Sequence, residues 1–321
     1  MKSISELTDF YYKDLYPELQ KLEKQREKLR SRVISIAVPA GLLGLVVAFM
    51  FRDAIALEPM NLLFIFIPLT AGGAFLYSYL IKDYVEEFKF KIIRPLIKAI
   101  DDRLEYSSQN HVRQTLFERS SIFTSRIDRM SGNDYVQGII DDTKLEFSDI
   151  HAEKRTKNSK GNDDWHTVFQ GIFIVGEFNK NFYGRTVILP DSAQSTFGDL
   201  FGNWLQSKNM QRDELVKMDS PDFEKEFVVY SDNQVEARYI LSHTLMQKLL
   251  TFKKKSEHPI SVSFVQNHIH IAVAYNKDLF EPSVFHSLLK YKIAMEYVKT
   301  LHLAIGIVEE LKLNQKLWSK R

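Results

Sequence analysis

Two long apolar runs near the N-terminus constrain this chain more than any other feature. The first extends from Val33 to Phe51 and the second from Leu62 to Ile81, and neither contains a charged side chain. Each matches the ~20 residues that an α-helix needs to cross the hydrocarbon core of a bilayer. A soluble protein rarely carries two such stretches back to back. The sequence therefore predicts a transmembrane hairpin over residues 33–81, with spans at 33–51 and 62–81.

The flanks of the two runs predict an orientation. Residues 21–32 hold six Lys or Arg residues and residues 82–98 hold five, whereas Arg52 is the only cation in the loop between the runs. Lys and Arg near membrane ends stay on the cytoplasmic side. We therefore expect a multi-pass protein with both termini in the cytoplasm. The first run begins too late and is too long for a cleaved signal peptide, so it should act as an uncleaved anchor.

Proline and glycine inside the spans have more than one reading. Pro39 and Pro68 are tolerated in lipid where a bend or a neighbouring helix satisfies the freed carbonyl group. Four glycines could let the two helices approach closely, or could reflect only how common glycine is in membrane helices. They are Gly41, Gly44, Gly72 and Gly73.

Residues 1–32 are expected to form a juxtamembrane helical segment in two pieces, with Pro17 in the first turn of the second piece. Leu15, Leu22 and Leu29 recur every seven residues, and Leu19 lies on the same face. This seam is too short to define a coiled coil. It fits either packing within the chain or self-association. The basic residues around it would also be attracted to anionic lipid headgroups.

Residues 82–106 should continue the second span as a juxtamembrane helix. Phe88, Ile92, Leu96 and Ile100 lie at i+4 spacing and form one apolar stripe. Pro95 should bend or interrupt that helix.

Composition limits the class of the remaining chain. Among 321 residues, 43 Lys and Arg balance 41 Asp and Glu, giving a net charge of +2. That balance argues against a nucleic-acid binder. Cysteine is absent, which excludes disulfides and thiolate chemistry and fits a reducing cytoplasm.

Residues 107–321 are predicted to form a cytoplasmic α+β domain with a mostly antiparallel sheet of about seven strands. Strand patterns fill residues 135–190, SGND (131–134) and Asp141-Asp142 look like turns, and residues 172–175 are typical of a central strand. Two short helices are expected after Ser231 and Ser242, the first opened by a Ser231–Gln234 capping box. A long terminal helix is expected over residues 283–313.

Residues 260–275 predict a β-hairpin with Gln266-Asn267 as its loop. This register pairs Phe264 with Ile269, Val262 with Ile271, and Ile260 with Val273, all on one buried face. Ser261, Ser263, His268 and His270 fall on the other face, so both histidines are expected at the surface. Two histidines on one strand face can be zinc ligands, but no third ligand follows by spacing.

Other chemically suggestive residues have structural readings. Asp141-Asp142 and Asp163-Asp164 look like loop residues, and Glu236 and Arg238 like members of a structural ion pair. Lys253-Lys254-Lys255 suits a solvated helix C-terminus. P-loop, HExxH, GxSxG and dinucleotide-binding motifs are absent. We therefore assign no catalytic, cofactor-binding or metal-ligating residue and no cofactor.

Residues 191–218 allow either a short helix that covers the core or an aromatic flap over a pocket. The apolar residues at helical spacing there are Phe197, Leu200, Phe201, Trp204 and Leu205.

Several segments resemble a bacterial family of membrane proteins, the domain-of-unknown-function family 3137 (DUF3137). The most specific is EFVVYSDNQVEARYILS (226–242), and FQGIFIVGEFNKNFYGRTVILPD (169–191) also resembles it. The resemblance spans residues 85–318. It implies a bacterial inner-membrane protein with two N-terminal spans and carries over no site residues.

These observations favour an integral inner-membrane protein with a cytoplasmic scaffold or binding domain. Its expected partners are the lipid bilayer together with a cytoplasmic protein, anionic lipid headgroups or a second copy of the chain, and not nucleic acid. The alternative is a membrane-tethered enzyme or small-ligand sensor with a pocket beneath residues 191–218. The absence of catalytic motifs favours the first.

Overall fold

The computed structural model describes residues 4–52, 60–140, 143–158, 160–177, 182–191, 214–256, 258–275 and 280–289. The chain divides into two compact units, which we describe separately. The helical unit comprises residues 2–96 and 281–295, and the sheet unit comprises mainly residues 97–280.

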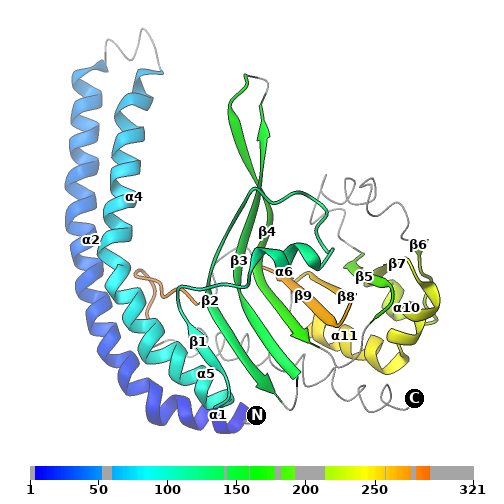
Figure 1. Ribbon diagram of the computed structural model, residues 1–321. Coiled ribbons are helices and arrows are strands. Elements are labelled where there is room, and N and C mark those ends of the chain that lie inside the picture. Colours follow the sequence, from blue (N-terminus) through cyan, green and yellow to red (C-terminus); the bar gives the residue numbers. More distant parts are fainter. Residues whose placement is uncertain are drawn as a thin grey trace. The chain divides into compact units, whose positions relative to one another are not determined.

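The helical unit is built on two long helices that pack against each other, α2 (Tyr16–Met50) and α4 (Asn61–Phe88) (Figure 1). Before α2 come α1 (Ile4–Phe10) and a π-helical turn, η1 (Tyr11–Leu15). After α4 come a second π-helical turn, η2 (Lys89–Ile93), and then α5 (Arg94–Ile100). Both apolar runs are therefore helical where the structure describes them.

The helical segments beside the apolar runs agree with the sequence patterns. Pro17 lies in the first turn of α2, and the predicted leucine seam is buried within the chain. The i+4 stripe from Phe88 to Ile100 is buried as well. Pro95 follows directly after η2. Proline has no N–H and clashes with the carbonyl group of residue i−4, so the widened π-turn is where the predicted interruption occurs.

Of the four glycines in the two apolar runs, Gly44 is the one at which the helices come close. A Cβ atom there would lie 2.8 Å from Leu69 Cδ2, whereas one at Gly41, Gly72 or Gly73 would meet nothing within 4 Å. Close approach therefore explains Gly44 and not the other three.

The described residues of the sheet unit form nine strands in the order β1-β2-β3-β4-β9-β8-β5-β7-β6, and every neighbouring pair is antiparallel. The strands are β1 (Glu105–Ser107), β2 (Arg129–Ile140), β3 (Thr143–Lys157), β4 (Asp163–Glu177), β5 (Arg185–Pro190), β6 (Glu214–Leu215), β7 (Phe227–Ser231), β8 (Ile260–Val265) and β9 (His268–Ala274). Mixed helix and antiparallel sheet is the predicted class. The two strands that the sequence did not predict are β1 and β6, short strands at the two edges of the sheet.

The hairpin of β8 and β9 has the predicted register, with Ile260, Val262 and Phe264 opposite Val273, Ile271 and Ile269. All six side chains are buried. The prediction for the opposite face is wrong, because Ser261, Ser263 and His270 are buried too. That face carries a second core, formed with α6 (Gln114–Arg119), in which Phe117 packs against Phe173 with ring centroids 4.9 Å apart.

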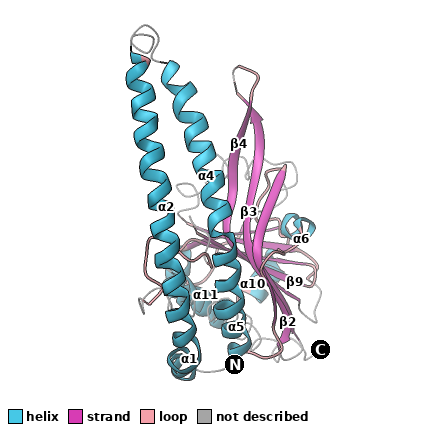
Figure 2. Ribbon diagram, turned by 90° about the vertical axis from the view of Figure 1, so that its left-hand side faces the viewer, coloured by secondary structure: helices cyan, strands magenta, loops and turns pink. Residues whose placement is uncertain are grey.

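The described part of the sheet unit also contains α9 (Pro221–Glu224), α10 (Gln234–Ile240) and α11 (His243–Ser256). Figure 2 shows α10 and α11 on the side of the sheet away from α6. Ser242 Oγ accepts a hydrogen bond from Leu245 N, as predicted for the start of α11. The cap of α10 is Asn233 rather than Ser231, since the Asn233 side chain accepts from Glu236 N. Ser231 Oγ instead donates to Arg185 O and joins two strands.

Two other local predictions are wrong. SGND (131–134) is not a turn: it lies inside β2, where the register shifts between Asn133 and Val136. Asp134 has a φ of 58°, so its turn-like conformation is used in a bulge. Residues 283–289 form bends and turns instead of the start of a helix, and residues 290–313 of the predicted terminal helix lie outside the described residues.

The β3–β4 pair extends beyond its neighbours. The pairing of β2 with β3 ends where Arg129 lies opposite Glu153. The pairing of β9 with β4 ends where Ala274 lies opposite Gly171. Past these points β3 and β4 pair only with each other, as far as Lys157 opposite Asp163. We call residues 154–166 the ribbon; Figure 1 shows it projecting from the sheet.

Candidate functional site: a basic groove at the base of the ribbon

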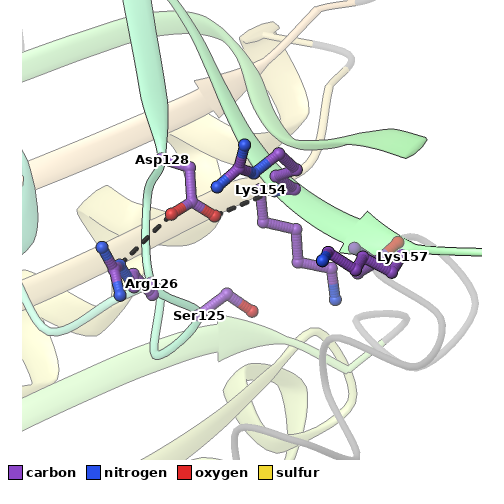
Figure 3. Close-up of a pocket in the computed structure, with 7 residues that line it drawn as sticks. Ser125, Arg126, Asp128, Lys154 and Lys157 are labelled. Atoms are coloured by element: carbon purple, nitrogen blue, oxygen red, sulfur yellow. Dashed lines mark hydrogen bonds and ion pairs between the residues drawn. The ribbon is translucent and has the colours of Figure 1, made fainter. Parts of the chain in front are cut away.

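A groove of about 490 Å³ lies where the ribbon leaves the sheet. We call it the basic groove, because four of its seven lining residues are Lys or Arg and one is acidic. The residues are Ser125, Arg126, Asp128, Lys154, Arg155, Thr156 and Lys157 (Figure 3).

One wall of the basic groove is the segment that links α6 to β2. Ile122 and Ile127 are buried in the core beneath α6 and hold this segment against the sheet. Ser125 and Arg126, between these anchors, remain at the surface. The backbone N–H of Asp128 donates to Glu153 O at 3.0 Å, which ties the segment to β3. The buried Ile122 and Ile127 therefore hold the polar residues between them at the surface of the groove.

The other wall is β3 itself. Asp128 connects the walls: one carboxylate oxygen accepts from the backbone N–H of Arg155 at 2.9 Å, and the other lies 3.2 Å from Arg126 Nε. The guanidinium of Arg155 is 3.3 Å from Asp163 on β4. The acidic group in the groove is thus already bound by the protein.

Sequence reasoning did not single out the basic groove. It identified a strand followed by a polar loop, although KRTKNSK (154–160) concentrates four cations in seven residues of a chain with balanced charge. Asp163 and Asp164, predicted to be loop residues, begin β4 and pair with Lys157 and Thr156. This run of cations is the sequence feature that points to the groove. The other wall of the groove, around Arg126, lies nearly thirty residues earlier in the chain.

His270 is not the surface residue that the sequence predicted, and His268 is half-buried. His270 is fully buried and stacked near Phe173, and its Nδ1 lies 3.3 Å from Ser263 Oγ. Burial lowers the pKa of His270 to about 3, so its imidazole stays neutral at physiological pH. Within the described residues, no group of three or more His, Cys, Asp or Glu side chains is placed to hold a metal ion.

Glu236 and Arg238 form no ion pair with any residue that the structure describes, in contrast to the expectation from the sequence. Glu236 accepts hydrogen bonds from the backbone N–H groups of Tyr183 and Gly184, at 3.0 and 2.6 Å. Arg238 is exposed and donates to the carbonyl oxygen of Lys217 at 3.4 Å. Glu236 therefore fixes the entry to β5, a structural role of a different kind from the one predicted.

The prediction that Lys253-Lys254-Lys255 form a solvated helix C-terminus is confirmed only in part. Lys253 is paired with Glu226 and lies over the ring of Phe227, 5.2 Å from its centroid, while Lys254 and Lys255 are exposed.

The helical unit contains a buried ion pair that the sequence did not indicate. Arg26 donates to both carboxylate oxygens of Glu23, at 2.8 and 3.0 Å, and to the carbonyl oxygen of Val284 at 2.7 Å. Glu23 in turn accepts from the backbone N–H of Leu288 at 2.9 Å. Burial acts to raise the pKa of Glu23, but these hydrogen bonds together outweigh it and lower the pKa below its ordinary value. The pair thus fixes residues 284–288 to α2.

The aromatic segment that might have covered a pocket, from Phe197 to Leu205, lies outside the described residues. Asp141-Asp142 also lie outside them, although the pairing of Ile140 with Thr143 agrees with a hairpin at that point.

Fold and groove together define a class: a protein of mixed helix and antiparallel sheet with two long apolar helices and a basic surface groove. Residues 167–313 match the family model described as "Protein of unknown function (DUF3137)", which confirms the predicted resemblance over those residues. The comparison with curated proteins gave no match.

Among solved structures, the crystal structure of the mycobacterial trehalose monomycolate transport factor A, TtfA, is similar over 64% of this chain and 91% of that chain. The sequence identity is 13% and the TM-score is 0.32. A likeness at this level does not establish a common fold.

Proposed function

We propose that this protein is a membrane-anchored binding protein, in which α2 and α4 cross a bilayer and the sheet unit binds a partner. The observation that carries the proposal is the exposure of apolar side chains along both helices. Leu43 is 65% exposed, Phe49 67%, Phe64 79% and Phe75 77%. Water would not tolerate so large a contiguous apolar surface, whereas lipid would cover it.

The burial pattern argues against the ordinary alternative. An apolar helix in a soluble protein is buried in the core, but only 6% of the most apolar window of the first helical stretch is buried, and 0% of that in the second. Both stretches are long enough to cross a bilayer. Backbone hydrogen bonds within each helix satisfy the polar groups that lipid cannot.

Orientation follows from charge, as the positive-inside rule requires. The cations at 21–32 and 82–98 adjoin the ends of the runs opposite to the connecting loop. Both termini and the sheet unit would then face the cytoplasm. The family resemblance supports a bacterial inner membrane as the location. Binding is favoured over catalysis because the basic groove contains cations and hydroxyl groups but no base activated by a neighbour.

A pair of reporter fusions tests this topology. A reporter active only outside the cytoplasm should be silent after Arg321 and active when inserted near Leu57. A reporter active only in the cytoplasm, placed at the same two sites, is the matched control and should give the reverse pattern. Extracytoplasmic activity after Arg321, or recovery of the untagged chain in the soluble fraction, would contradict the proposal.

A further inference from the structure

The basic groove contains positive charge that the protein itself does not neutralise. Asp128 is bound by Arg126 and by the backbone of Arg155, and the Arg155 side chain faces Asp163. Within the described part of the chain, neither the Lys154 side chain nor the Lys157 side chain has an ion pair or hydrogen bond. Two ammonium groups are therefore available to a ligand.

The two lysines belong to one strand, β3, and border the same groove. Both line the groove together with Ser125, and Figure 3 shows the Lys154 side chain leaving β3 toward the Ser125 side. Lys154 is half-buried and Lys157 is exposed. Partial burial strengthens a charge interaction, because the effective dielectric there is lower than in bulk water.

The chemistry of the donors selects the ligand. A phosphoryl group carries about −1.5 to −2 charges at pH 7 and three strong acceptor oxygens. Two ammonium groups balance that charge, and the Ser125 hydroxyl supplies a further donor. A single carboxylate would leave one ammonium group uncompensated. The groove volume of about 490 Å³ is in the range of small-molecule sites.

We propose that the basic groove binds a phosphoryl group, carried by a soluble phosphate compound or by a lipid headgroup, between Lys154, Lys157 and Ser125. This inference names the ligand class of the binding function proposed above. It rests on that function only in taking the sheet unit as the part that binds.

Binding can be measured on the full chain in nanodiscs of zwitterionic lipid, by calorimetric titration with two probes. Inorganic pyrophosphate represents a soluble phosphate. Short-chain phosphatidic acid below its micelle concentration represents a lipid headgroup, because its phosphate is a monoester with the charge and oxygens required above. We expect saturable binding of at least one probe. A lower Kd for pyrophosphate would identify a soluble ligand, and a lower Kd for the lipid would identify a headgroup.

The decisive comparison uses two double variants with the same change in charge. Lys154→Gln with Lys157→Gln should raise the Kd of the bound probe at least tenfold. Lys254→Gln with Lys255→Gln, at the exposed end of α11, should leave it within twofold. Equal losses in both variants, or no saturable binding of either probe, would overturn the inference. Membrane fractionation of the same variants separates such a failure from a failure of anchoring.

Discussion

Gly171, in the central strand β4, offers the sharpest test of the sheet. Its φ is 149°, and a Cβ atom there would lie 2.1 Å from Val273 O and 2.8 Å from Tyr275 N. Both neighbours are backbone atoms of β9 and the residue that follows it, so they cannot rotate away as a flexible side chain could. Gly171→Ala must therefore either move β9 or break the pairing of Gly171 with Ala274.

The expected cost has two parts. An unfavourable backbone conformation costs about 1–3 kcal/mol, and forcing an extra methyl group into a packed site costs about 1–3 kcal/mol. The sum, roughly 2–6 kcal/mol, is a large share of the ~5–15 kcal/mol that stabilises a typical domain. At about 2–4 °C per kcal/mol for a unit of this size, Tm should fall by roughly 5–20 °C.

Gly161→Ala is the matched control, because Gly161 also has a positive φ, 81°, but a Cβ atom there would meet nothing within 4 Å. It isolates the conformational cost, about 1–2 kcal/mol. Thermal melts of the full chain in one detergent, followed by circular dichroism, give both values. If Gly171→Ala melts within 2 °C of Gly161→Ala, the close approach of β4 and β9 is refuted.

Two further predictions concern buried side chains and use the same melts. Ile271→Ala should lower the free energy of unfolding by about 2–5 kcal/mol, as expected for a buried aliphatic residue. His270→Ala should lower it by about 1–3 kcal/mol, because its face of the sheet is buried as well. An unchanged Tm for His270→Ala would mean that this face is open to solvent. Glu23→Gln should lower the free energy of unfolding by about 3–5 kcal/mol, because it leaves the buried Arg26 without its carboxylate. Glu27→Gln, at an exposed position of the same helix, is the control and should change Tm little. Similar losses in both variants would contradict the buried pair.

Local patterns predicted the elements whose determinants are local. The β8–β9 register followed from alternating side chains and a two-residue loop, and Gln266 has the positive φ, 57°, that a tight hairpin loop favours. What covers each face is a tertiary property. Ser261, Ser263 and His270 look like a solvated face, but Ala272, the cross-strand neighbour of Ser261, belongs to a buried cluster that contains Phe117 and Phe173.

The basic groove shows the same limit. KRTK (154–157) is visible in the sequence, but whether its charges are free depends on Asp128, whose carboxylate is occupied by Arg126 and by the Arg155 backbone. Neither contact follows from spacing. The two segments that form the groove are joined by hydrogen bonds between Asp128 and residues Glu153 and Arg155, and no periodic pattern in the sequence predicts such contacts.

The Glu23–Arg26 pair links α2 to the region that matches the family model. Its two backbone partners, Val284 O and Leu288 N, lie within residues 167–313. A buried charge without its partners is strongly destabilising, so α2 and residues 281–289 depend on each other. This dependence is consistent with their grouping in one compact unit despite a separation of more than 250 residues. Val284 and Leu288 therefore complete, with backbone groups, the hydrogen bonding of a buried ion pair on the helix that carries the first apolar run.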